Sequence, residues 1–312
     1  MNLAICICTY KRNNKLSECL KSIEKINLLN KSSVKIIIVD NTINNNSYNL
    51  IKRISKKFKH NISYFNEKRR GVVYARNKCL EVLKKINPTY VSFFDDDCII
   101  DKGWMVNIQK VKKLQDANII TGPQIHRKQR ESEKKLLNFS DFFEKKNYGL
   151  MLVKWASTNN VFFKYNILKQ RNLSFDIKLN KFGMGEDQLF FSTLSKMGNK
   201  ILWYEKIIVF ETIHPDRVKV SWLKNRSFRL GVLGHYIDKK MYGKFFGYSI
   251  NYLKSIFFLI LSINYMIFSI TNNKKMKIFS IGFFYRFYGK LRSEEHTSEL
   301  QSRGLISYAV FC

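Results

Sequence analysis

Three consecutive aspartates, Asp95, Asp96 and Asp97, stand directly after the apolar stretch Tyr90 to Phe94. The stretch has the composition of a buried strand, so the carboxylates are expected where that strand ends. Carboxylates crowded beside apolar chain repel one another and lose hydration, and a divalent cation relieves both effects. Mg²⁺ or Mn²⁺ commonly binds one or two carboxylates together with the phosphates of a substrate. In isolation, the same three residues would equally suit a solvated acidic turn.

The composition indicates a folded protein with an anionic partner. The chain has 312 residues, 45% of them hydrophobic, and only three prolines, which suits one large α/β domain plus an appendage. Its formal net charge of +31 suggests a nucleic acid, a nucleotide or an acidic lipid as partner. Lys, Asn and Ile are abundant throughout, so the bias of an AT-rich genome is a second explanation for the lysine excess.

The cysteines and the chain ends carry further expectations. The six cysteines form no C-x-x-C pair and no zinc-type spacing with histidine, so free thiols in a reducing compartment are expected. The first residues are apolar over too short a span for a signal peptide, which predicts a cytoplasmic start. Residues 292–312 switch abruptly to a Ser- and Glu-rich composition and resemble the translation of a sequencing adapter, so they are not expected to belong to the fold.

Strand-like and helix-like patterns alternate along the first 100 residues. Strands are expected at 3–8, 34–39, 62–66 and 90–94, and helices at 15–26, 47–58 and 71–85. This alternation predicts βαβ units and a doubly wound sheet whose ligands bind outside the carboxyl ends of the strands. Asp40 and the three aspartates after residue 94 fall at such ends. If the strand continued past Asp95, Asp96 would point to the opposite side from its neighbours.

The middle of the chain is less regular. A helix is expected at 104–114, strands within 118–123, 155–163 and 201–210, and a second helix that starts near residue 185 and ends by residue 197. Residues 127–147 are rich in charge and are expected to form a mobile loop or a surface helix.

The C-terminal part changes character from about Phe245 to Tyr288. The apolar stretch 255–270 is shorter than the ~20 residues that a spanning helix needs, and lysines flank it. A hairpin that lies in or dips into a bilayer fits this pattern, with Lys and Tyr at the level of the headgroups. A buried pair of core helices is the alternative.

A series of short motifs, none of them convincing alone, occurs in one order along the chain. The motifs are Cys8 to Arg12, Ile38 to Asn41, Gly71 to Asn77, Phe94 to Asp97, Thr121 to Pro123, Thr158 to Val161, Phe175 and Asp176, Gly185 to Asp187, and Glu211 with Arg217. Together they resemble an inverting glycosyltransferase of family two. The resemblance implies an α/β GT-A fold, a Rossmann-like doubly wound mixed sheet, over residues 1–232. A helical, membrane-associated region at 233–291 would follow.

The resemblance also implies a nucleotide-sugar donor, with a UDP-sugar favoured, and a Mn²⁺ or Mg²⁺ ion. The implied donor-binding residues are Thr9, Tyr10, Arg12, Asp40, Arg76, Asp95, Asp96 and Asn159. The implied metal ligands are Asp95, Asp97 and His214. Tyr10 and Asn159 could instead be structural, and His214 is used in this way by only some relatives.

Two carboxylates are implied in the reaction itself. Asp187 matches the general base of the family, which deprotonates the acceptor hydroxyl, and Glu186 would contact acceptor or sugar hydroxyls. A helix N-terminal carboxylate favoured by the helix dipole is the alternative for Asp187. Asn41 stands where many relatives have a second acidic residue, which leaves the identity of the base open.

The expected function is transfer of a sugar, with inversion, to a glycan or lipid-linked acceptor at the cytoplasmic face of an anionic membrane. A nucleotidyltransferase would need a glycine-rich phosphate loop after the first strand, and residues 9–14 contain no glycine. A basic nucleic-acid-binding protein, or a membrane scaffold with a degenerate transferase domain, would not need the carboxylates. Nucleic acid is therefore not the expected partner.

Overall fold

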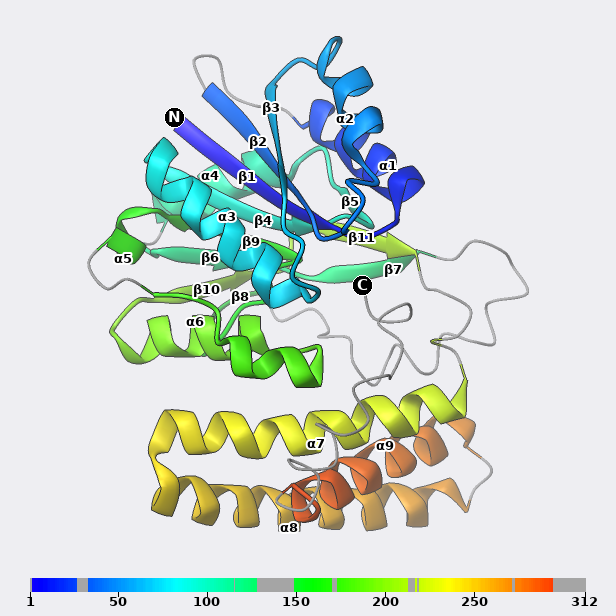
Figure 1. Ribbon diagram of the computed structural model, residues 1–312. Coiled ribbons are helices and arrows are strands. Elements are labelled where there is room, and N and C mark those ends of the chain that lie inside the picture. Colours follow the sequence, from blue (N-terminus) through cyan, green and yellow to red (C-terminus); the bar gives the residue numbers. More distant parts are fainter. Residues whose placement is uncertain are drawn as a thin grey trace. The chain divides into compact units, whose positions relative to one another are not determined.

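The computed structural model describes residues 2–26, 33–114, 116–127, 149–169, 173–212, 217, 219–270 and 273–293 (Figure 1). The chain divides into two compact units. Among the described residues, the first unit lies within 2–127 and 149–212, and the second lies within 217–293.

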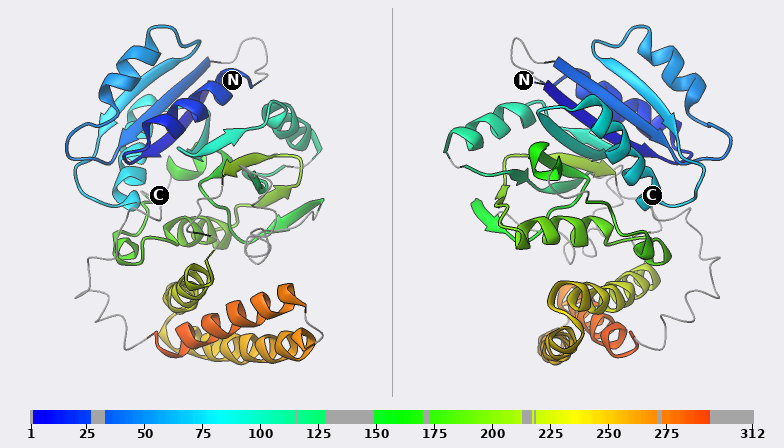
Figure 2. Two further views of the ribbon diagram at one scale, coloured as in Figure 1. Left: turned by 90° about the vertical axis from the view of Figure 1, so that its right-hand side faces the viewer. Right: turned by 60° about the vertical axis from the view of Figure 1, so that its left-hand side comes forward.

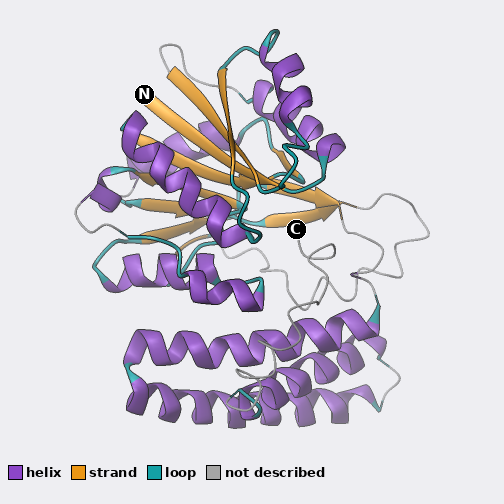
Figure 3. Ribbon diagram, viewed as in Figure 1, coloured by secondary structure: helices purple, strands orange, loops and turns teal. Residues whose placement is uncertain are grey.

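The first unit is built on an eight-stranded mixed sheet (Figure 3). Its strand order is β3-β2-β1-β4-β9-β6-β10-β8. The bounds are β1 Asn2–Thr9, β2 Ser33–Asp40, β3 Asn61–Asn66, β4 Tyr90–Asp95, β6 Ile119–Thr121, β8 Leu150–Val153, β9 Asn160–Lys164 and β10 Ile201–Tyr204. Strands β3, β2, β1 and β4 are parallel, and β9 is antiparallel to both of its neighbours. The expected doubly wound α/β sheet is confirmed, in mixed form.

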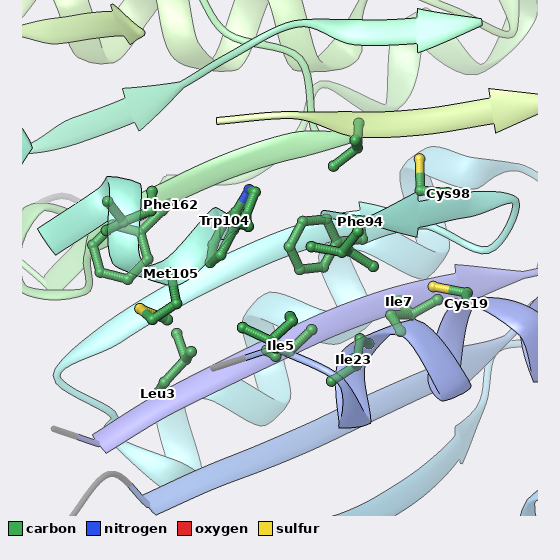
Figure 4. Packing of buried hydrophobic residues seen from close by; sticks show 14 of the residues in the cluster. Leu3, Ile5, Ile7, Cys19, Ile23, Phe94, Cys98, Trp104, Met105 and Phe162 are labelled. Carbon is green, nitrogen blue, oxygen red and sulfur yellow. The ribbon is translucent and has the colours of Figure 1, made fainter. Parts of the chain in front are cut away.

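Both faces of the parallel strands are buried, as their near-continuous apolar sequences require. On one face, Ile5 and Ile7 pack with the apolar side of α1 (Asn13–Glu24) and with Trp104 of α4 (Trp104–Leu114), as Figure 4 shows. On the other face, Ala4 and Cys6 pack with α3 (Val72–Ile86). The short helix α2 (Tyr48–Ser55) connects β2 to β3.

A second, three-stranded sheet was not expected from the sequence. Its strands are β5 (Cys98–Ile100), β11 (Val209–Thr212) and β7 (Gln124–Arg127), in that order. The strand expected within 201–210 is found as β10 of the large sheet, and a turn at residues 205–206 separates it from β11 of the small sheet, which was not expected.

The rest of the first unit consists of short helical elements and one longer helix. They are α5 (Asn166–Lys169), the 3₁₀ helix η3 (Ile177–Phe182) and α6 (Glu186–Lys196). The start of α6 agrees with the helix expected near residue 185. The charged segment expected at 127–147 lies outside the described residues apart from its first residue.

The second unit contains α7 (Val220–Tyr242), α8 (Lys244–Ser269) and α9 (Lys274–Leu291), which run alongside one another (Figure 2). Glycines permit close approach: a Cβ atom on Gly231 would lie 2.3 Å from the carbonyl oxygen of Arg286, and one on Gly289 would lie 2.1 Å from that of Phe228. The domain boundary expected after residue 232 falls within α7. With its 26 residues, α8 is long and apolar enough to cross a membrane.

Asn160 forms a polar connection in the core of the first unit. It is fully buried; its Oδ1 accepts a hydrogen bond from Trp104 Nε1 at 2.9 Å, and its Nδ2 donates to the carbonyl oxygens of Pro123 and Ile207 at 3.1 and 2.8 Å. One side chain thereby joins α4, the residue before β7 and the segment between β10 and β11.

We expect Asn160→Ala to lower the free energy of unfolding by about 2–4 kcal/mol, because several buried polar groups lose their partner at once. Urea denaturation followed by tryptophan fluorescence measures the change. Asn107→Ala is the matched control, since Asn107 makes an exposed hydrogen bond to Lys206 O and its loss should cost under ~1 kcal/mol. Equal destabilisation by the two variants would show that the buried hydrogen bonds of Asn160 contribute no more to stability than an exposed one.

Candidate active site

The polar residues at the carboxyl ends of three neighbouring strands lie in register. Thr9 of β1 pairs with Asp40 of β2, and Cys8 pairs with Asp95 of β4. These are the strand ends at which a doubly wound sheet binds its ligands. The parallel arrangement therefore brings Thr9, Asp40 and Asp95 to one edge of the sheet.

The three aspartates divide into two groups. Because β4 ends at Asp95, the chain turns, and Asp96 and Asp97 lie together against Arg12. Arg12 Nη1 lies 2.8 Å from Asp97 Oδ2 and 3.3 Å from Asp96 Oδ1, and Thr9 Oγ1 donates to Asp96 Oδ2 at 2.7 Å. Lys15 Nζ is 3.8 Å from Asp97. The strand does not continue, so Asp96 and Asp97 share one set of partners.

Asp95 is the most accessible of the three carboxylates. Its side chain is 42% exposed, against 5% for Asp96 and Asp97, and Arg76 Nη2 lies 3.3 Å from its Oδ1. Desolvation raises the pKa of Asp95 to about 6 in spite of Arg76, and the charges of Asp97, Glu211 and Asp187 raise it further. The site is therefore rich in negative charge that the neighbouring cations do not fully balance.

Arg76 connects Asp95 to the helix that carries the other carboxylates. It projects from α3, is 7% exposed, and forms an ion pair with Glu186 as well as with Asp95. Glu186 is 3% exposed, and burial raises its pKa although the Arg76 charge opposes this. The Glu186 carboxylate therefore faces a buried guanidinium.

Asp187 follows directly in the first turn of α6 and is only half-buried. Its Oδ2 accepts hydrogen bonds from Ser157 Oγ at 2.9 Å and from the Thr158 backbone N–H at 3.4 Å, and its Oδ1 accepts from the Gln188 N–H at 2.7 Å. These contacts fix the carboxylate in the first turn of α6. Accessibility and a fixed position are both properties that a general base requires.

Asp40 is fully buried, and the protein itself supplies its partners. Its carboxylate accepts hydrogen bonds from the N–H and the hydroxyl of Thr42, from the Ser47 N–H and from the Tyr64 hydroxyl, at 2.7 to 3.1 Å. Desolvation and the bond to Asp40 raise the pKa of Tyr64 well above its ordinary value. Asp40 thus shapes the loop that follows β2.

Tyr10 is half-buried at the end of β1, and two cations lie near its ring. Lys11 Nζ is 5.6 Å and Arg70 Cζ is 5.9 Å from the ring centroid. Asn41 holds Arg70's loop in place by donating to the carbonyl oxygens of Glu67 and Arg69 and accepting from the Gly71 N–H. An aromatic ring beside two cations suits an anionic ligand that carries a planar base.

Asn159 begins a chain of polar side chains that sequence reasoning missed. Its Nδ2 donates to Gln124 Oε1, Gln124 Nε2 donates to Glu211 Oε2, and His126 Nδ1 lies 3.7 Å from Glu211. Gln124 and His126 belong to β7, whose pairing with β11 brings them to Glu211. The only sequence signal was their position just after the Gly122–Pro123 turn.

Asp95 and Asp97 can supply two carboxylates to a divalent cation. Within the described residues, no group of three or more His, Cys, Asp or Glu side chains converges as a complete metal site. His214, the third ligand expected, lies outside those residues. The negative charge at Asp95, which Arg76 balances only in part, fits a cation, and two carboxylates suffice where ligand phosphates complete the coordination shell.

Comparison with known proteins agrees with this geometry. The family model described as Glycosyl transferase family 2 matches residues 4–178. The succinoglycan biosynthesis protein ExoM of Rhizobium meliloti (strain 1021) is 24% identical over 253 residues, covering 78% of this chain and 77% of ExoM.

Solved structures share the fold at lower identity. The mannosyltransferase PcManGT from Pyrobaculum calidifontis, in complex with GDP-Man and Mn²⁺, aligns with a TM-score of 0.60 at 14% identity, covering 94% of this chain and 86% of that one. S. aureus TarS 1–349 in complex with UDP aligns with a TM-score of 0.52 at 15% identity, covering 96% and 92%. The expected GT-A architecture is confirmed by these neighbours.

The raised pKa of Asp95 leads to a stability prediction. The folded protein binds the proton of the Asp95 carboxyl group more tightly than the unfolded chain does. The charged carboxylate therefore destabilises the metal-free fold, fully so above about pH 6. This destabilisation fades as the pH falls toward 3.8. We therefore expect Asp95→Asn to raise the melting temperature in EDTA at pH 7.5, with a smaller gain at pH 5.

Asp116→Asn is the control for this experiment. Asp116 is an exposed aspartate whose pKa is lowered by Lys164, 2.9 Å away, so its loss should bring no stabilisation at pH 7.5. A melting temperature of Asp95→Asn at or below that of the parent at pH 7.5 would show that the Asp95 charge is fully compensated.

Proposed function

Because the chain belongs to glycosyl transferase family 2, we propose that this glycosyltransferase moves a sugar from a nucleotide diphosphate to a glycan or lipid-linked acceptor, with inversion and with the help of a metal ion. The observation that carries the proposal is the Asp95–Arg76–Glu186 chain. It joins the acidic end of β4 to the helix turn that carries Asp187. A donor held at the strand ends and a base on α6 would then share one site.

The donor would bind along the ends of β1, β2 and β4. Tyr10 and its neighbouring cations would face the base and phosphates of the donor. Thr9 would position the Asp96 carboxylate, and Arg12 would position that of Asp97. Asp40 would position the loop after β2. TarS structures contain UDP and UDP-GlcNAc, which supports a UDP-sugar, whereas PcManGT contains GDP-Man. Asn159 would lie on the sugar side of the site, held by Gln124.

Asp95 and Asp97 would hold Mn²⁺ or Mg²⁺, and His214 would be the third protein ligand. Bound there, the ion would neutralise the charge that develops on the leaving nucleoside diphosphate. The Mn²⁺ in the PcManGT structure supports this assignment. To admit a cation, Asp97 must loosen its contacts with Arg12 and Lys15, which frees both cations for the diphosphate.

Asp187 would accept the proton of the acceptor hydroxyl as that oxygen attacks the anomeric carbon. Ser157 and the Thr158 N–H would hold its carboxylate in place during the transfer. Glu186 would position α6 through Arg76 and would not contact the acceptor directly, because its carboxylate is buried. Inversion follows when attack occurs in line from the face opposite the leaving group.

The acceptor would be a growing glycan or a lipid-linked sugar at the cytoplasmic face of the membrane. The similarity to a succinoglycan biosynthesis protein supports a role in polysaccharide biosynthesis. The apolar helix α8 and the positive net charge support association with an anionic membrane rather than with nucleic acid.

Replacing the base should separate donor binding from turnover. We expect Asp187→Asn to bind the donor as the parent does and to lose about 10²–10⁴-fold in kcat, because a general base acts only on the acceptor proton. Calorimetric titration with the donor and a transfer assay measure the two quantities. Asp116→Asn, an exposed change beside Lys164, which pairs with the first residue of β4, should alter neither. Near-normal transfer by Asp187→Asn would remove Asp187 from the role of base.

A screen of nucleotide sugars tests the proposed activity and its metal dependence. We expect slow hydrolysis of one donor in Mn²⁺ or Mg²⁺, its loss on chelation, and its return when the ion is restored. Asp97→Asn should weaken binding of that donor in the presence of the ion by about tenfold or more, since one of two carboxylate ligands is lost.

Two outcomes would count against this assignment. Hydrolysis that persists in excess chelator would exclude the metal role of Asp95 and Asp97. Unaltered donor and metal binding by Asp97→Asn, with Asp116→Asn as the reference, would move the ion elsewhere.

A further inference from the structure

Helix α8 exposes an almost continuous apolar surface. Its side chains with more than half of their area exposed include Phe245, Phe246, Tyr252, Leu253, Phe257, Ile260, Met266, Ile267 and Phe268. Such a surface, along a 26-residue helix, is far more apolar than the exposed face of an ordinary soluble helix. The exposed apolar face of α8 therefore indicates a surface that binds a partner.

The opposite side of α8 is small and polar and packs within the second unit. Its buried residues are Gly247, Asn251, Ser255 and Ser262. Ser262 Oγ donates to Ser280 O of α9 at 3.0 Å, and a Cβ atom on Gly247 would lie 2.7 Å from Lys239 Cα of α7. The helix is thus two-sided, which is the pattern of a helix at an interface rather than one surrounded by lipid.

A charged network ties the first half of α8 to α7 and α9. Asp238 of α7 lies 2.6 Å from Lys254 Nζ of α8 and 3.5 Å from Lys290 Nζ of α9, and Lys290 donates to Asn251 Oδ1 at 2.8 Å. If α8 crossed a bilayer along its whole length, α7 would enter the hydrocarbon with it. Charged side chains at the centre of a bilayer are strongly unfavourable, and α7 carries Lys, Arg and Asp side chains from Lys224 to Lys240.

The remaining half of α8 is too short to cross alone. Residues 255–269 extend about 22 Å at ~1.5 Å per residue, less than the ~30 Å of a hydrocarbon core. A hairpin that dipped inward would carry its tip deepest, and α9 begins there with Lys274, Lys275 and Lys277. Both ends of the α8–α9 pair are therefore basic, and only the middle of α8 is uniformly apolar.

We propose that α8 lies parallel to the membrane plane, with its exposed apolar face in the headgroup and acyl boundary of an anionic leaflet. Residues 244–291 contain no Asp or Glu, and the exposed lysines Lys244 at one end of α8 and Lys274 and Lys277 just beyond the other end complement acidic headgroups. The inference rests on the proposed function, because a lipid-linked acceptor would bring the transferase to such a surface. The partner is a lipid surface, bound from one side only.

Depth measurements along α8 test the orientation. Phe246→Cys, Phe257→Cys and Phe268→Cys place a bimane label at the start, middle and end of the exposed apolar face, in the full chain bound to phosphatidylcholine and phosphatidylglycerol vesicles. Spin-labelled lipids with a shallow or a deep nitroxide then quench the label. We expect the shallow lipid to quench all three positions to a similar extent, because a helix in the membrane plane keeps a constant depth.

The controls exclude labelling and folding effects. Leu152→Cys, at an exposed apolar residue of β8 in the first unit, should not be quenched, and the unsubstituted chain gives the background from its own thiols. Phe257→Glu should weaken vesicle binding by about tenfold or more, whereas Leu152→Glu should not. Hydrolysis of the donor is measured on the same samples.

Each result decides the proposal. A depth that increases steadily from Phe246→Cys to Phe268→Cys would show a helix that crosses or dips, and would overturn it. Absence of quenching at all three positions, with self-association of the chain, would give this face to a second copy. If donor hydrolysis fails while the three labels lie at one depth, the proposed function is wrong and the membrane geometry stands. If the donor is hydrolysed while the labels lie at different depths, only the membrane geometry is rejected.

Discussion

A single buried arginine holds the two halves of the candidate site in relation to each other. Arg76 lies between Asp95 at the end of β4 and Glu186 at the start of α6, and it is almost inaccessible to solvent. Removing Arg76 would leave the buried carboxylate of Glu186 uncompensated, which costs more than the pair contributes to stability. The position of α6, and with it the carboxylate of Asp187, therefore depends on the same guanidinium that faces the acidic turn.

The three carboxylates of the acidic turn, Asp95 to Asp97, lower the stability of the fold when no metal ion is bound. Burial and mutual repulsion raise the pKa of Asp95 to about 6, while Arg12 and Thr9 relieve part of the unfavourable energy at Asp96. Negative charge that is only partly balanced disfavours the empty fold and favours binding of a cation and its anionic ligand. Stability and ligand affinity are therefore opposed at this point of the chain.

Local patterns predicted the parallel half of the sheet because each strand there is an apolar run followed by a helix with regular spacing. The rule that ligands bind at strand ends then placed Thr9, Asp40 and Asp95 together. Contacts that depend on the pairing of distant segments could not be predicted from local sequence patterns. No local signal separates β10 from β11, brings His126 of β7 to Glu211, or shows that the partners of Asp40 are Thr42, Ser47 and Tyr64.

The distribution of charge separates two explanations of the lysine excess. Drift toward Lys codons would add cations on solvated surfaces throughout the chain, but it would not remove acidic residues from one region. Residues 1–219 contain 20 Asp or Glu, whereas residues 220–291 contain only Asp238, which is buried against Lys254 and Lys290. The α7–α9 unit therefore presents cations with no exposed acid among its described residues, and an anionic surface is the partner that such segregation favours.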